Sequence, residues 1–234
     1  PAPPSPEEVA RRERERAERQ RQEQARIEAA HARAAAEAAA LWAQASDQGE
    51  SAYLTRKGVQ AYGLRFTTDG RVLVPLRDDR GELRNVQTIN ASGEKRFLPG
   101  GKKSGLWCMA GLNSSAKRKG ESVDFIEEIN NGKNFTLVEN GPAVLLVCEG
   151  YATAASVHQA TGRPAAVAFD AGNLANVAKA LRKLHPAALL VLAGDDDQAT
   201  EARTGTNPGR VKAEAAARAV HGLAVFPEPL PEGG

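Results

Sequence analysis

Acidic side chains follow two apolar runs in the second half of the sequence, directly where each run ends. Glu149 comes after residues 143–148, and Asp195 and Asp197 come after residues 187–193. If the two runs are neighbouring parallel strands, their carboxyl ends lie at the edge of the sheet where ligands of such sheets bind. Carboxylates that face one another repel unless a cation lies between them, and all-oxygen ligands select Mg²⁺ or Mn²⁺. We therefore predict a divalent-metal site formed by these three carboxylates.

Two further acids lie close to this set in the sequence. In an extended segment alternate residues point to the same side, so Asp196 is expected to face away from Asp195 and Asp197. Asp170 also ends an apolar run, 164–169, but an acid at that position can equally cap the helix that follows. Both readings of Asp170 stay open, whereas three consecutive acids before a polar stretch are poorly explained as a helix cap.

The pattern around these acids, over residues 141–227, is that of an α/β domain. Apolar runs without a polar face alternate with amphipathic stretches, which predicts a parallel sheet covered by helices on both faces. The expected strands are 143–148, 164–169, 187–193 and 223–226, and the expected helices are 151–161, 173–184 and 209–220. A polar loop is expected between the third strand and the last helix.

The preceding residues, 46–140, predict a smaller β-rich subdomain of the α+β type. Short runs in which apolar and polar residues partly alternate are separated by turn residues, and this pattern is typical of antiparallel strands. The expected strands are 71–76, 82–89 and 95–98. Charge also separates the halves: residues 51–120 carry fourteen Lys and Arg against five acids, whereas residues 121–234 carry nine against fourteen.

A basic subdomain beside an acidic site is suited to polyanionic ligands such as nucleic acids and nucleotides. Lys95, Arg96, Lys102 and Lys103 flank a glycine-rich loop and are the best candidates for phosphate contacts. A merely solvated loop is the alternative for these four residues. Residues 117–119 are basic as well, and we expect them to act as a nonspecific tether.

Residues 1–45 are expected to form a proline-rich lead-in followed by a charged helix. Eight Arg and eight acids cancel there, and an apolar patch appears only at Leu41 and Trp42, which favours a solvated connecting helix. Residues 228–234 resemble a linker.

Composition excludes several classes of protein. No apolar run reaches the roughly 18 residues of a membrane span, which excludes a membrane-spanning protein. Two cysteines are too few for a disulfide scaffold. The net charge of +2 by itself predicts neither nucleic-acid nor membrane binding. We therefore expect a cytoplasmic protein, and the start at Pro1 without Met suggests a fragment of a larger one.

The acidic motifs together resemble the Toprim domain, which bacterial-type primases, topoisomerases and certain nucleases share. Residues 149–154 and 168–174 are most similar to the Toprim primases of conjugative plasmids (the TraC type), phages and integrative elements. Upstream, Trp42 and residues 53–59 resemble the entry segment of those proteins. Residues 70–77 through 95–98, together with 105–107, resemble the basic half of the bacterial primase core. The resemblance covers residues 41–226. This sequence departs from the family pattern in one place, because it lacks the usual glycine shortly after Asp-x-Asp, and Gly209 is the first plausible counterpart of that glycine.

This resemblance implies a DNA primase, an RNA polymerase that makes short primers from NTPs on single-stranded DNA with Mg²⁺ or Mn²⁺. Asp195 and Asp197 are then metal ligands, and Glu149 binds metal or serves in proton transfer near the 3′ hydroxyl. The expected nucleotide- and DNA-binding residues are Lys95, Arg96, Lys102, Lys103, Asp170, Asn173 and Lys212. A helicase or relaxase domain is the expected partner, because no zinc module or helicase is present in the sequence.

Two other functions remain open from the sequence. One is a Toprim nuclease or a topoisomerase fragment. A topoisomerase would need a nucleophilic tyrosine in a separate domain. Tyr151 lies beside Glu149 but is expected to pack in the core. The other is a non-catalytic DNA-binding or docking module of a relaxase.

Overall fold

The computed structural model describes residues 5–110 and 144–227. The basic residues 117–119, the boundary expected near residue 140, residues 1–4 of the expected lead-in and the linker 228–234 lie outside the described residues. Among the described residues, no helix is both long enough and apolar enough to cross a bilayer.

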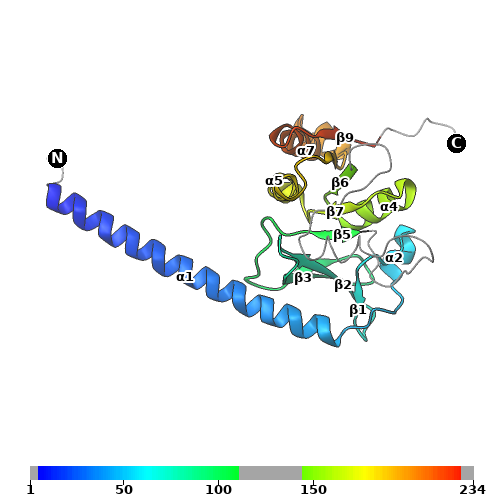
Figure 1. Ribbon diagram of the computed structural model, residues 1–234, viewed down its shortest axis with the longest axis horizontal. Coiled ribbons are helices and arrows are strands. Elements are labelled where there is room, and N and C mark those ends of the chain that lie inside the picture. The colour runs from blue at the N-terminus through cyan, green and yellow to red at the C-terminus, as the bar shows by residue number, and fades with distance from the viewer. Residues whose placement is uncertain (1–4, 111–143, 228–234) are drawn as a thin grey trace.

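Helix α1 (Pro6–Gln44) is a single long rod whose first half projects away from the rest of the protein (Figure 1). A capping box begins it, since the Ser5 hydroxyl accepts from the Glu8 amide and the Glu8 carboxylate accepts from the Ser5 amide. Only its C-terminal part is anchored: Ala34 and Ala38 are buried, and this part contacts β3. The helix is therefore solvated over its first half, as predicted, and packed over its second half.

The basic half forms a four-stranded antiparallel sheet in the order β1-β2-β3-β4. Its strands are β1 (Arg65–Phe66), β2 (Val72–Arg77), β3 (Leu83–Ile89) and β4 (Lys95–Phe97). The three predicted strands match β2, β3 and β4. Helix α2 (Ala52–Lys57) was not predicted from the sequence. It ends at Gly58, which has a left-handed backbone conformation.

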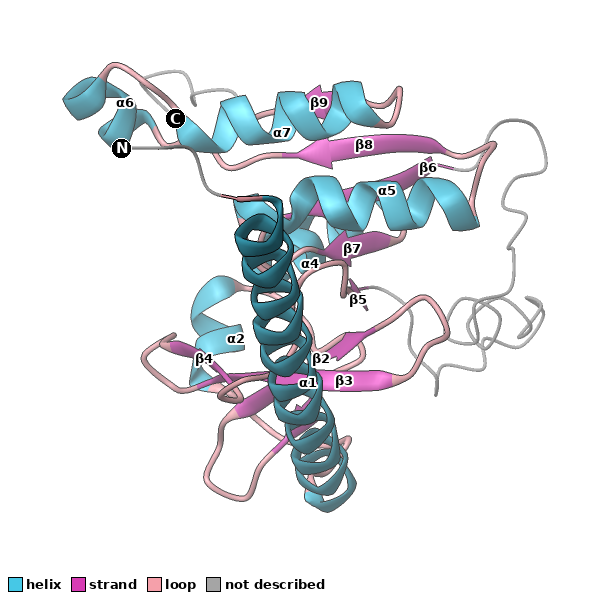
Figure 2. Cartoon of the chain, turned by 90° about the vertical axis from the view of Figure 1, so that its left-hand side faces the viewer, coloured by secondary structure: helices cyan, strands magenta, loops and turns pink. Residues whose placement is uncertain are grey.

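The second sheet has the order β5-β7-β6-β8-β9, with helices on both faces (Figure 2). Its strands are β5 (Cys108–Ala110), β6 (Val144–Cys148), β7 (Ala165–Val167), β8 (Leu189–Ala193) and β9 (Leu223–Val225). The helices are α4 (Tyr151–Thr161), α5 (Leu174–Leu184), α6 (Gln198–Thr204) and α7 (Pro208–Ala219), with a short 3-10 turn η1 (Ala171–Asn173) before α5.

Strands β6 to β9 are parallel, which confirms the predicted α/β sheet. Two features of this sheet differ from the prediction. Strand β5 adds an antiparallel edge next to β7, and α6 occupies the stretch expected to be a polar loop. An isolated bridge between Arg77 and Trp107 joins the two sheets at this edge.

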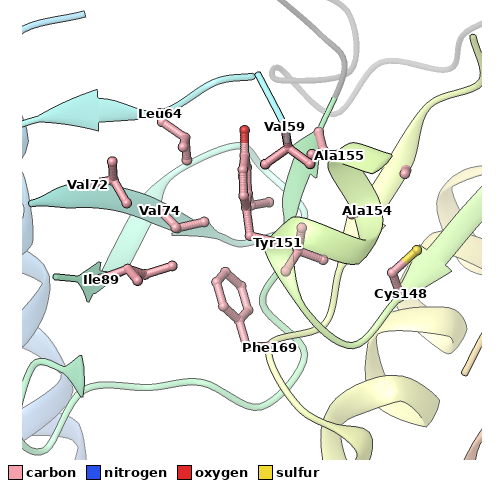
Figure 3. Packing of buried hydrophobic residues seen from close by; sticks show 14 of the residues in the cluster. Val59, Leu64, Val72, Val74, Ile89, Cys148, Tyr151, Ala154, Ala155 and Phe169 are labelled. Atoms are coloured by element: carbon pink, nitrogen blue, oxygen red, sulfur yellow. The ribbon is translucent and has the colours of Figure 1, made fainter. Parts of the chain in front are cut away.

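Two hydrophobic clusters lie on opposite faces of the parallel sheet. Along β6, Leu146 and Cys148 belong to the cluster shared with α4 and the basic half, whereas Leu145 and Val147 belong to the cluster under α5 and α7. Figure 3 shows the first cluster, in which Tyr151 lies among side chains of both halves. The basic half and the α/β half therefore share one core, which fixes β4 relative to the ends of β6 and β8.

Candidate active site

Glu149 and Asp195 lie at the carboxyl ends of β6 and β8, which are adjacent and in register, with Cys148 opposite Ala193. The pKa of Glu149 is raised to about 7, first by burial and then by the negative charges of Asp195 and Asp197. A hydrogen bond from the Asp195 backbone amide and the charge of Lys212 oppose this increase. The structure thus brings the predicted acids together at one edge of the sheet.

Asp195 as a whole residue is exposed, yet partial desolvation of its carboxylate by the surrounding protein raises its pKa above the ordinary value. The charge of Asp197 acts in the same direction, and the ammonium group of Lys95 opposes it. Lys95 comes from β4 of the basic half, so one cation of that half faces the acids of the other.

The donor set fits a divalent cation in its chemistry. Glu149 Oε1 is buried and has no hydrogen-bond partner among the described residues, while the charges of Asp195 and Asp197 repel the Glu149 carboxylate. A cation would satisfy the unpaired oxygen and remove the repulsion. In the described part of the chain, however, no group of three or more His, Cys, Asp or Glu side chains is arranged to hold a metal ion.

Asn207 anchors the acidic loop that follows β8. Its carbonyl Oδ1 accepts from the backbone amides of Asp197 (3.3 Å) and Arg210 (3.2 Å), and its amide donates to Asp196 Oδ1 (2.7 Å). Asn207 is 4% exposed, so these bonds are shielded from water. This role of Asn207 was not predicted, although Asn followed by Pro208 is a helix-start signal that could have indicated it.

Asp196 points away from the carboxylate pair, as the alternation predicted. It forms an ion pair with Arg210 (2.9 Å) and also accepts from Asn207 and the Gln198 side chain. The hydrogen bond from Gln198, followed by that from Arg210, lowers the pKa of Asp196. Asp196 therefore holds the loop to α7 instead of joining the site.

Gly209 is required where it lies, in the first turn of α7. A Cβ atom on Gly209 would lie 2.4 Å from the backbone oxygen of Asp195, a distance that only movement of the backbone could relieve. This close approach supports Gly209 as the counterpart of the glycine that follows Asp-x-Asp in Toprim domains.

Gly209→Ala is expected to displace Asp195, lower the stability by roughly 1–3 kcal/mol through overpacking and impair the site. Gly150→Ala is the matched control beside the same carboxylates, since the atom nearest to its added Cβ is the mobile end of Lys95, 3.6 Å away. Chemical denaturation of both variants tests this, and equal stability of the two would contradict the steric argument.

The predicted basic residues differ in where they point. Lys103 forms an ion pair with Asp170, and its ammonium group lies 5.5 Å from the centre of the Phe97 ring. Lys102 is exposed on the loop between β4 and β5.

On β4, Arg96 and Lys95 are adjacent residues and therefore point to opposite sides of the strand. Arg96 pairs with Glu94 (2.6 Å), so it faces away from the acids of the site. Of the four candidates, Lys95 and Lys103 lie beside acidic residues of the α/β half.

Asp170 both pairs with Lys103 and caps the turn η1, where its Oδ1 accepts from the Asn173 backbone amide (3.0 Å). The capping interpretation of Asp170 is therefore confirmed, and its binding of nucleotide or DNA stays a prediction. The residue before it, Phe169, has a left-handed backbone (φ 72°), which is costly for a bulky side chain, and its ring meets Phe97 edge-on at 5.9 Å.

Asn173, expected to bind nucleotide or DNA, is instead buried at 3% exposure. Its Oδ1 accepts from the Gly105 amide (2.8 Å), and its amide group lies within hydrogen-bond distance of the carbonyls of Lys103 (3.2 Å), Leu106 (3.2 Å) and Ala168 (2.9 Å). With both polar atoms engaged, Asn173 is a positioning residue that ties the basic loop to the end of β7.

Asn173→Ala is expected to lower the free energy of unfolding by about 2 kcal/mol, because buried loop groups lose their partners. Asn176→Ala is the control: Asn176 is exposed and donates a single bond to Ser104 of the same loop (2.9 Å). Urea denaturation compares the two, and a loss as large in Asn176→Ala would refute the assignment.

Tyr151 is fully buried, and its hydroxyl is bonded to the Tyr62 amide (2.5 Å) and to the carbonyls of Gln60 and Tyr62 (both 3.1 Å). Burial raises its pKa well above the ordinary value. A hydroxyl in this state is not a nucleophile, so Tyr151 packs in the core as predicted.

Residues 144–231 match the family model of the Toprim domain, which agrees with the resemblance drawn from the motifs of the sequence. Two Escherichia coli proteins named DNA primase TraC are 39% and 36% identical to it over 178 and 177 residues, 75% of this chain in each case. The chain spans only 11% and 14% of the length of these relatives.

Among solved structures, the primase fragment of the bacteriophage T7 primase-helicase protein is similar at a TM-score of 0.47 and 14% identity. That similarity covers 76% of this chain and 64% of the T7 chain.

Proposed function

We propose that this chain is the catalytic core of a DNA primase, which joins NTPs into short RNA primers on a single-stranded DNA template. The observation that carries the proposal is the meeting of Glu149, Asp195 and Asp197 at one sheet edge, faced by Lys95 of the basic half. The similarity to proteins named DNA primase TraC supports it.

The reaction needs negative charge to be neutralised on a triphosphate. The 3′ oxygen of the growing strand forms a bond to the α-phosphorus, the bond to the leaving pyrophosphate breaks, and the 3′ hydroxyl gives up its proton. Mg²⁺ or Mn²⁺, when bound, would neutralise the charge on both oxygens of this displacement. Asp195 and Asp197 are the proposed ligands, with Glu149 as a third ligand or as the proton acceptor.

Cations of the basic half would bind the phosphates. Lys95 lies next to the carboxylates, whereas Lys103 is held near the end of β7 by Asp170 and Phe97. Lys212 on α7 lies close enough to Glu149 to lower its pKa and is a third candidate. In this proposal a larger cytoplasmic protein supplies a helicase or relaxase domain, which would present the template strand.

The direct test is synthesis of labelled oligoribonucleotides from NTPs on single-stranded DNA in the presence of Mg²⁺ or Mn²⁺. Primers that depend on both template and metal would support the proposal. Cleavage of DNA without synthesis would instead support a Toprim nuclease, and DNA binding without either reaction would support a docking module.

A further inference from the structure

A groove of about 500 Å³ lies between the long helix α1 and the loop that joins β4 to β5. It is lined by Arg26, Ile27, Ala30, His31 and Arg33 of α1 and by Gly100 and Gly101 of the loop. This groove, which we call the helix–loop groove, takes no part in the carboxylate site, and neither the motifs nor the relatives' names assign it a role.

The groove forms because α1 leaves the protein at this point. Ala30, Ala34 and Ala38 are spaced four residues apart on one face of α1. Ala34 and Ala38 are buried, whereas Ala30, nearer the projecting end of the helix, is only partly buried. The loop approaches Ala30 closely: a Cβ on Gly100 would lie 3.2 Å from the Ala30 Cβ. Small residues on both sides therefore leave an open channel beside the contact.

The lining of the groove is suited to a strand with phosphates on one side and bases on the other. Arg26 and Arg33 are cationic and exposed, and none of the described residues that line the groove is acidic. Glu23 pairs with Arg26 at 3.2 Å, but both partners are largely exposed, so the pair is weak and phosphate can replace it. Ile27 is 38% exposed and offers apolar surface to a base or sugar.

The same loop connects this groove to the candidate active site. Gly100 and Gly101 line the groove, and two residues later Lys103 pairs with Asp170 and is held by Asn173 through its carbonyl. A strand bound along this loop could contact Arg33 and Arg26 at one end and Lys103 at the other.

We propose that the helix–loop groove binds the sugar–phosphate backbone of single-stranded DNA and extends the template site beyond the carboxylates. The ligand class rests on the proposed function, while the site itself rests on the groove and its charges. Helix α1 then serves as one wall of the template channel and not merely as a connecting helix.

The test is the salt dependence of single-stranded DNA binding by the full chain, measured by fluorescence anisotropy with a labelled oligothymidylate and no divalent metal. Each lost phosphate contact lowers the slope of log affinity against log salt by about 0.7 for single strands. The double variant Arg26→Gln/Arg33→Gln should therefore bind several-fold more weakly with a slope shallower by about 1.4.

Arg12→Gln/Arg16→Gln is the matched control, because it removes the same charge from the exposed part of the same helix, about 20 Å away along its axis. An equal effect of both double variants would mean general attraction and would overturn the proposal, as would no effect of either. A second variant, Ile27→Glu, should also weaken binding, whereas Val9→Glu, at an equally exposed apolar position, should not.

Two further measurements separate this proposal from its neighbours. If ATP competes at the groove, so that Arg26→Gln/Arg33→Gln weakens ATP binding as much as DNA binding, the groove holds free nucleotide and the proposal is wrong. If wild-type protein binds DNA through the groove but makes no primers, the proposed function fails while the groove assignment stands.

Discussion

Asp195→Asn and Asp197→Asn are each expected to reduce primer synthesis about a thousandfold or more, while the protein stays folded. A metal ion contributes several kcal/mol of charge stabilisation to phosphoryl transfer, and each 1.36 kcal/mol corresponds to about a factor of ten in rate. Neutralising either acid removes a proposed ligand but also relieves repulsion, since the charge of Asp197 raises the pKa of Asp195. Primer yield per enzyme, followed alongside thermal unfolding, measures both effects.

Asp196→Ala is the control at the adjacent position, and the structure predicts the opposite pattern for it. Asp196 binds Arg210 and Asn207, so its loss should lower the melting temperature through the loop while leaving metal-dependent synthesis largely intact below that temperature. If all three substitutions abolished synthesis equally without unfolding the protein, the assignment of the two aspartates as ligands would fail.

Glu149→Gln is expected to lower primer synthesis by a factor of about 10² to 10⁴, the range for loss of a general base, with near-normal DNA binding. It should also stabilise the metal-free protein at alkaline pH. The pKa of Glu149 is about 7 in the folded protein against an ordinary value of 4.5, so the folded state binds its proton more tightly than the unfolded state does.

Ionisation of the Glu149 carboxyl therefore lowers the free energy of unfolding as the pH rises from about 4.5 to about 7. Above pH 7 the free energy of unfolding stays lowered by this amount. Glu149→Gln cannot ionise, so the difference in stability between pH 5 and pH 8 should be smaller in the variant than in wild-type protein. Urea denaturation with EDTA at both values measures it, and identical pH profiles would show that Glu149 ionises normally.

The sequence alone is sufficient to find the α/β half and its acids. Strands that are buried on both faces have no polar positions, so β6 and β8 stand out as apolar runs, and the acids that end them must lie at one edge of a parallel sheet. Alternation along the chain also separates Asp196 from its two neighbours. These features depend on local pattern and on rules that hold for every parallel sheet.

Short elements were not predictable because their stability comes from partners distant in the chain. Strand β5 has three residues and gains its pairing from β7, and α6 lies in a polar segment without an apolar stripe. For α2, the left-handed Gly58 at its end was a usable signal, but six residues form a helix only with tertiary support.

The roles of single polar residues were decided only by the tertiary structure. The family resemblance predicts that Asn173 binds nucleotide or DNA, yet packing buries it and directs its amide to the loop of Lys103. Arg96 and Lys95 are neighbours of equal charge, and only the pleat of β4 and its position opposite the α/β half direct one toward the acids. Long-range contacts set these directions, because a residue's type and spacing carry no information about what another domain places in front of it.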